Sequence, residues 1–334
     1  MVIDGRDRAD RLLALAVRLL PPGRRDWGRA MCAESAAIEP GRERRHHTLG
    51  CLRVVLAQPA ALRAIGYPLF GVTVLAGVLR WSGGISFAPL RWGVVGVVAL
   101  LLSVAAWGRR PGVLGPVDAG RAPRALRAGG GVLVGALAAT FASTAGSHGS
   151  PRDQAVFGLP IFTVVLTACL LGLLTVTAER TEVSGRALGT SAAVSLAAAG
   201  WWLISQVALP PMPAGVGGTV VVTGFGIATV VYVGARRDDG AQETLLAALC
   251  VPVLTPLLVF AQVLVLSGYG PAWLIPDLVP AAISPADDLE NSRIEVQDPY
   301  VALLFLAGLA ALILTVTSLA SRRPAGSEDA EVAG

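Results

Sequence analysis

Long stretches without any charged residue are the feature of this sequence that most limits its fold. Three of them, Val94–Trp107, Val156–Ala178 and Leu188–Val207, contain no Asp, Glu, Lys or Arg. A helix of about 20 apolar residues spans the roughly 30 Å hydrocarbon layer of a bilayer. Inside that layer the backbone must satisfy its own hydrogen bonds, so such stretches form helices. The sequence therefore predicts an all-α fold, a polytopic transmembrane helical bundle.

The distribution of these apolar stretches predicts about eight spans. Only 15% of the residues are charged, whereas soluble domains carry about 25%. The predicted spans are 64–80, 92–107, 126–146, 155–178, 187–209, 216–234, 243–267 and 299–320. This divides the chain into an amphipathic helical region (1–63), the transmembrane bundle (64–320) and a disordered tail (321–334). One long connection, 268–298, joins the last two spans.

Basic residues predict the orientation. All 27 basic residues are Arg, and with these spans only Arg80, Arg91, Arg152 and Arg293 fall outside. The positive-inside rule therefore places both termini in the cytoplasm. The absence of Lys and the heavy use of Ala, Gly, Val, Leu and Pro indicate a high-GC bacterial gene, so the expected location is a bacterial plasma membrane. The net charge of +4 follows from this orientation and does not indicate nucleic-acid binding. Without Lys, the chain cannot form a Walker phosphate loop, a Schiff base or a Ser-Lys dyad.

The amphipathic region predicts three helices. The first carries an apolar face and ends at Pro21-Pro22-Gly23; its apolar residues are Leu12, Leu13, Ala16, Leu19 and Leu20. The second is expected at 26–38. The third is expected to begin near Thr48 and to lead through Pro59 towards the first span.

A basic cluster precedes the first span: Arg42, Arg44, Arg45, His46 and His47. Such a cluster is expected to contact either anionic headgroups of the inner leaflet or a cytoplasmic protein partner. Another interpretation is that its positive charge only fixes the orientation of the first span.

A structural zinc site is the alternative interpretation of the same segment. It would need four ligands, here Cys32, His46, His47 and Cys51. The zinc anti-sigma motif, which His47-x3-Cys51 partly resembles, continues with a second cysteine, where this chain has Val54. No cofactor is therefore expected.

The external connection 268–298 is strongly acidic. Asp287, Asp288 and Glu290 are candidates for binding a divalent cation, because hard cations prefer clustered oxygen ligands. A basic partner is a second interpretation, and a solvated acidic loop is the third. Ser284-Pro285-Ala286-Asp287 is typical of a helix start, with a serine cap, a proline in the first turn and an acid at the third position.

Within the spans, charged residues are nearly absent. Gln206 and Gln262 are polar but neutral, and each is expected to bond a neighbouring helix. The lack of a titratable relay argues against proton-coupled transport. Pro160, Pro252 and Pro256 are expected to bend their helices; bent helices are compatible with a cavity but are also ordinary in membranes.

Two segments carry a family resemblance. The runs Leu19–Pro21, Arg25–Met31 and Leu49–Arg53, with Pro276–Pro280 and Asp298–Tyr300, resemble uncharacterised actinobacterial polytopic integral membrane proteins. The first 60 residues also resemble the prefix helices before some bacterial permeases. The resemblance implies membrane location and no activity.

The function predicted from the sequence is non-catalytic. The N-terminal helices are expected to dock a cytoplasmic partner or the inner leaflet, while the bundle resides in the lipid bilayer. The alternative is a transporter or permease component for a neutral or lipid-like solute. The sequence does not indicate an oligomeric state.

Overall fold

The structure is a computed structural model of the chain. It describes residues 6–20, 22–39, 41–110, 114–147, 152–181, 183–212, 216–278 and 284–322. The predicted tail therefore lies almost wholly outside the described residues. The chain separates into two compact units, 1–79 and 80–334, and each is described by itself.

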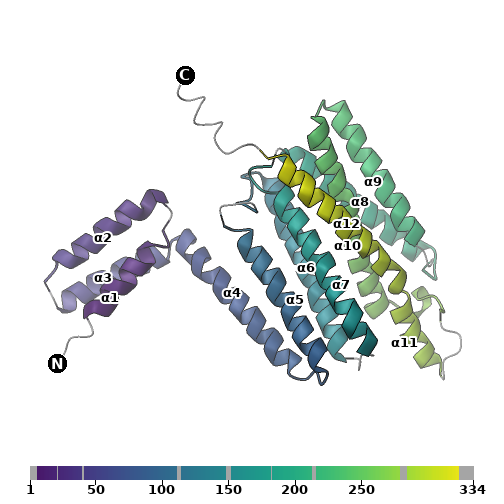
Figure 1. The fold of residues 1–334 in the computed structure, drawn as a ribbon, viewed down its shortest axis with the longest axis horizontal. Coiled ribbons are helices and arrows are strands. Elements are labelled where there is room, and N and C mark those ends of the chain that lie inside the picture. Colours follow the sequence, from purple (N-terminus) through teal and green to yellow (C-terminus); the bar gives the residue numbers. More distant parts are fainter. Residues whose placement is uncertain are drawn as a thin grey trace. The chain divides into compact units, whose positions relative to one another are not determined.

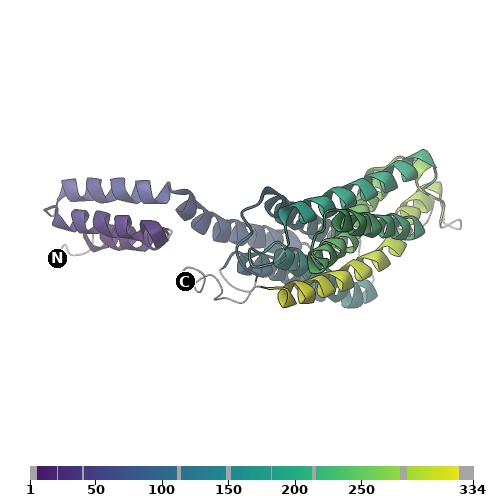
Figure 2. The same cartoon turned by 90° about the horizontal axis from the view of Figure 1, so that it is seen from above.

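The first unit is a three-helix module followed by a long apolar helix. Its helices are α1 (Arg6–Val17), α2 (Arg25–Ala37), α3 (Arg42–Leu56) and α4 (Pro59–Ser82), with a 3-10 turn, η1, at Pro22–Arg24. Helices α1, α2 and α3 pack against one another (Figures 1 and 2). Their shared core is apolar and consists of Leu13, Ala16, Val17, Leu20, Cys51 and Val55.

The second unit is the helical bundle. Its long helices are α5 (Ala88–Trp107), α6 (Arg121–Ser147), α7 (Arg152–Val176), α8 (Gly185–Ala208), α9 (Val216–Arg236), α10 (Ala241–Tyr269) and α12 (Asp298–Ala320). With α4, eight helices in the described part of the chain are long and apolar enough to cross a membrane. The predicted all-α fold and the eight spans are confirmed, and the chain is an integral membrane protein.

The predicted start of the third N-terminal helix is wrong. Helix α3 begins at Arg42, six residues before Thr48. The segment 42–47 is almost entirely charged or imidazole-bearing, so apolar periodicity gives no signal there. The basic cluster therefore lies on a helix, and its members point in different directions around the axis.

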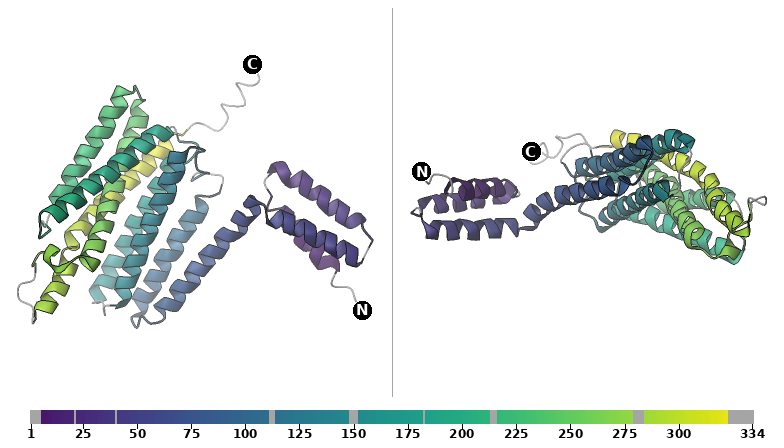
Figure 3. Two further views of the ribbon diagram at one scale, coloured as in Figure 1. Left: turned by 180° about the vertical axis from the view of Figure 1, so that it is seen from behind. Right: turned by 90° about the horizontal axis from the view of Figure 1, so that it is seen from below.

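Helix α10 forms the centre of the bundle and packs against α8, α9 and α12. About half of its residues are buried, and the helix continues through Pro252 and Pro256. Helix α9 lies at one edge, beside α8 and α10 (Figure 3). Helices α7 and α12 pack with their backbones close together, because a Cβ on Gly172 would lie 3.0 Å from the Ala311 carbonyl oxygen.

The bundle has two distinct ends. Helix α11 (Pro285–Glu295) and the 3-10 turn η2 (Ala272–Leu274) lie between α10 and α12 in the chain. The end of the bundle that carries them is called the α11 end. An apolar cluster closes this end and consists of Met212, Leu274, Ile275 and Val296. At the opposite end, loop residue Val117 pairs with Ala178, and Thr181 pairs with Arg322, in isolated β-bridges.

Candidate functional site

A partly buried set of polar contacts links the helices of the α1–α3 module. The Arg44 guanidinium donates to the Asp10 carboxylate at 2.8 Å, and the Ser35 and Thr48 hydroxyls are 2.7 Å apart. The Ser35 hydroxyl also lies 3.5 Å from Asp10. The Arg44 side chain is only 23% exposed. Arg44 therefore serves the packing of the module, because its charge is already neutralised inside it.

The remaining basic residues divide between surface and interior. Arg42, Arg45 and His46 are exposed. His47 is half-buried, and its Nε2 lies 3.5 Å from the Cys51 sulfur. Three of the five predicted contact residues are therefore exposed, whereas Arg44 and His47 lie against the core of the module.

Arg42, Arg45 and Leu49 form one stripe along α3. Their spacing of three and four residues puts them on the same side of the helix, and Leu49 is 57% exposed. Only Ala57 and Gln58 separate α3 from α4, and both amides bond back into the last turn of α3. The exposed basic and apolar stripe is therefore tied closely to a membrane-spanning helix.

The module contains two free cysteines, of which Cys51 is buried and Cys32 is half-buried. Burial raises the pKa of Cys32, and the neighbouring Cys51 and Asp10 raise it further. Burial also raises the pKa of Cys51, together with Glu34. In the described part of the chain, no three His, Cys, Asp or Glu side chains gather as metal ligands would. The zinc alternative thus gains no support.

Of the three acidic candidates on α11, Asp287 takes part in the cap of its own helix. Ser284 caps the helix by accepting from the Asp287 amide at 3.2 Å, and its hydroxyl donates to the Asp287 carboxylate at 2.6 Å. The predicted serine cap and proline start are thereby confirmed. Asp288 has one buried, unpartnered carboxylate oxygen, and Glu290 is exposed.

Arg293 attaches α11 to the end of α10. Its guanidinium donates to the carbonyl oxygens of Ser267 and of Gly270, the latter at 2.7 Å. A positive side chain suits these carbonyls, because the C-terminus of a helix carries partial negative charge. The 268–298 connection is therefore an ordered cap on the bundle wherever the structure describes it.

Arg127 is a structural residue that the sequence reasoning missed. From α6 its guanidinium donates to the Leu174 carbonyl at 2.7 Å and to the Thr177 hydroxyl at 2.8 Å. It also donates to the Gly108 and Gly115 carbonyls, both at 3.2 Å. One side chain thus joins α5, α6, α7 and a loop at the end opposite α11. Its position at the boundary of an apolar stretch was the only available signal.

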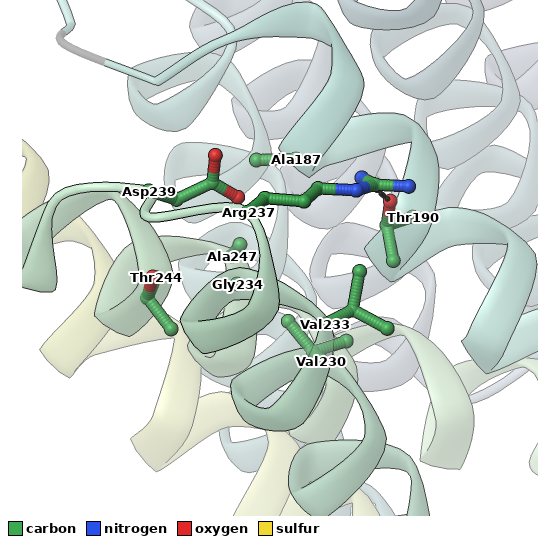
Figure 4. A pocket seen from close by; sticks show the side chains of 9 residues that line it. All are labelled: Ala187, Thr190, Val230, Val233, Gly234, Arg237, Asp239, Thr244 and Ala247. Carbon is green, nitrogen blue, oxygen red and sulfur yellow. Dashed lines mark hydrogen bonds between the residues drawn. The ribbon is translucent and has the colours of Figure 1, made fainter.

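A shallow hollow opens between α8, α9 and α10 at that same end (Figure 4). Arg237 extends across it and donates to the Thr190 hydroxyl at 3.2 Å. Water-sized molecules have only about 10 Å³ of room in it, whereas ligand pockets usually exceed about 300 Å³. Val230 and Ala247 contribute an apolar lining. The hollow has too little volume to enclose a drug-sized ligand.

Several buried polar atoms inside the bundle have no partner among the described residues. They include the Trp202 indole nitrogen, the Gln206 and Gln262 side-chain oxygens, and the Thr219 hydroxyl. The expected bonds from the two glutamines to neighbouring helices are thus absent at their oxygens. The sequence did not single out Trp202 and Thr219 as unpaired polar residues, because indole and hydroxyl groups are common in apolar spans.

Comparisons with known proteins are negative: no protein-family model, curated protein or solved structure matches the chain. The resemblance to actinobacterial integral membrane proteins stays a prediction.

Proposed function

We propose that the α1–α3 module docks on the anionic headgroups of the inner leaflet, and that the bundle anchors it there without catalysis. The observation that carries this proposal is the exposed stripe of Arg42, Arg45 and Leu49 on α3. A helix of this kind lies in the membrane interface with its apolar side chains in lipid and its basic side chains at phosphate groups.

The short connection from α3 to the membrane-spanning helix α4 makes a weak attraction between Arg and anionic lipid sufficient for docking. Each Arg near an anionic leaflet contributes roughly 1 kcal/mol, which would hold a free module only weakly. Because two residues join α3 to α4, the module stays within reach of the bilayer and docking becomes intramolecular. Exposed Leu12 and Leu15 on α1 offer additional apolar area for the same contact.

The proposal includes the orientation. Anionic lipids are concentrated in the cytoplasmic leaflet, and the Arg distribution supports cytoplasmic termini. The location is accordingly a bacterial plasma membrane. The alternative occupant of the stripe is a cytoplasmic protein, which an acidic surface would suit equally well in charge.

The test measures the depth of residue 49 in the membrane. Full-length protein with a nitroxide at Leu49→Cys, in a background without its four native cysteines, is placed in nanodiscs of phosphatidylcholine with or without phosphatidylglycerol. Collisions with oxygen should rise and those with a water-soluble nickel chelate should fall when the anionic lipid is present.

Matched charge removal provides the control. Arg42→Gln with Arg45→Gln should return the label to water. Arg18→Gln with Arg29→Gln removes the same charge from the turn after α1 and from α2, where both residues are also exposed, and should leave the label in lipid. A label that stays in water in anionic discs would refute leaflet docking and leave a protein partner as the occupant.

Transport of a neutral or lipid-like solute is the second candidate function. It is favoured by one observation, the unpaired polar atoms buried between α8, α9 and α10. These groups are costly in a bundle that offers them no partner.

A further inference from the structure

Three unpaired polar groups lie at the α11 end of helices α8 and α9. They are the Trp202 indole N–H, the Gln206 side-chain carbonyl and the Thr219 hydroxyl. The residues are 1%, 4% and 0% exposed, respectively. Lipid cannot satisfy a polar group, so buried groups of this kind require a partner or an explanation.

The three residues lie where the last two turns of α8 meet the first turn of α9. Trp202 and Gln206 lie one turn apart on the buried face of α8. A Cβ on Gly218 of α9 would lie 3.9 Å from Trp202 Cδ1, the ring atom bonded to the indole nitrogen. The Cδ1 edge of the indole therefore lies against the first turn of α9, where Thr219 is the next residue. Tyr300 of α12 packs edge-on against the indole, with ring centroids 5.7 Å apart.

A fourth polar group lies at the same depth on α10. The Ser191 hydroxyl of α8 donates to the Ala247 carbonyl of α10 at 2.7 Å, which fixes the register of these two helices. Both helices run from the same end of the bundle, and Gln206 and Gln262 each follow the bonded residue by the same number of positions. The unpaired oxygen of Gln262 thus lies level with that of Gln206.

Two exposed glycines begin the turn of α9 that carries Thr219. Gly217 and Gly218 lie on the outward side of α9, where a Cβ on Gly217 would meet no atom within 4 Å and one on Gly218 would meet only Trp202. Beyond them the apolar cap closes the α11 end, held by the Met212 amide donating to the Leu274 carbonyl at 2.8 Å. The polar groups therefore lie beneath an apolar cover, next to the least bulky turn of α9.

The chemistry of the groups defines the ligand. The indole N–H needs an acceptor, the Gln206 oxygen needs a donor, and the Thr219 hydroxyl can take either role. None of the three carries a charge. We propose that Trp202, Gln206 and Thr219 form a binding site for a small neutral solute with an amide or hydroxyl group. This inference is independent of leaflet docking by the α1–α3 module.

The test uses acetamide, which both donates and accepts hydrogen bonds, and acetone, which only accepts. The midpoint of thermal unfolding of the full-length protein in nanodiscs is measured against the concentration of each. A ligand that binds only the folded state raises this midpoint. Acetamide should therefore give a rise that saturates, relative to acetone, in the natural protein.

Variants locate the effect. Thr219→Val and Gln206→Leu should each abolish the acetamide response, and Thr219→Ser should retain it because the hydroxyl remains. Thr167→Val is the matched control, since Thr167 of α7 also has a buried, unpartnered hydroxyl and its loss should leave the response unchanged.

Two outcomes would overturn the proposal. One is an acetamide response that is absent, or that persists in both Thr219→Val and Gln206→Leu. The other is no response together with a lower unfolding midpoint in Thr219→Val, which would identify water as the partner of these groups. The depth of the label at residue 49 is unaffected in either case, so failure here leaves the docking proposal standing.

Discussion

Substituting Gly172 with alanine should destabilise the bundle at the seam between α7 and α12. The new Cβ would lie 3.0 Å from the Ala311 carbonyl oxygen and 3.3 Å from the Ala311 Cβ. Comfortable carbon contacts need about 3.5–4.0 Å. The obstacle is backbone, which cannot rotate away, and the seam is tight on the facing helix too, where a Cβ on Gly308 would come within 3.3 Å of Val165.

The magnitude follows from two opposing effects. Overpacking a well-packed core costs about 1–3 kcal/mol, whereas Gly→Ala inside a helix gains about 1 kcal/mol. Gly158→Ala in the same helix supplies the second effect alone, because its Cβ would meet nothing within 4 Å. The free energy of unfolding of Gly172→Ala should therefore lie about 1–3 kcal/mol below that of Gly158→Ala.

Native cysteines provide the assay. Cys169 and Cys250 are both fully buried, so a thiol-reactive fluorophore labels them only as the bundle opens. Replacing Cys32 and Cys51 with serine removes the background from the first unit. Heating at one fixed rate keeps the variants comparable even where unfolding is irreversible. Equal unfolding midpoints for Gly172→Ala and Gly158→Ala would show that α7 and α12 are not in backbone contact at Ala311.

Three further predictions concern other parts of the chain. Arg127→Gln should lower the free energy of unfolding by about 3 kcal/mol, because several charge-assisted bonds are lost, whereas exposed Arg124→Gln should change it little in the same thiol assay. Arg293→Gln should release α11 from α10 and speed its cleavage by protease added to nanodiscs, with no change if α11 is held otherwise. Burial raises the pKa of Cys32 and Cys51 above the ordinary 9.0. The folded state therefore holds these protons more tightly, so module stability is constant below about 9 and falls as pH rises through the raised values; helicity of the module that is unchanged by alkaline titration would contradict this.

The spans could be predicted from the sequence because one physical constraint determines them. A charge-free stretch long enough to cross lipid has no alternative to a helix, and all eight predicted spans overlap a helix of the structure. The predicted ends of the spans differ from the helix ends by a few residues; α5, for example, begins at Ala88 rather than at residue 92. Polar and aromatic side chains near the interface can lie inside or outside a helix without changing the apolar pattern.

The sequence could have predicted which residues of the basic cluster are exposed and which face the core, but only with the correct start of α3. Once α3 begins at Arg42, the spacing places Arg44, Thr48, Cys51 and Val55 on one face. That face is the buried one, and Arg44 meets Asp10 there. Because the helix was expected to begin near Thr48, all five basic residues seemed equivalent, and the pairing with Asp10 stayed hidden.

The unpaired groups between α8 and α9 show where sequence reasoning ends. Gln206 stands out in an apolar span, but whether it meets a partner depends on the register of the facing helix. That register is set by close packing: a Cβ on Gly226 of α9 would lie 2.9 Å from Val251 and 3.2 Å from Val194. Sliding α9 by one turn, about 5.4 Å, would move Thr219 away from the indole edge of Trp202. The arrangement of these polar groups is therefore a consequence of apolar packing about two turns away, so a bulkier residue at Gly226 should disturb it without touching any of the hydrogen-bonding groups.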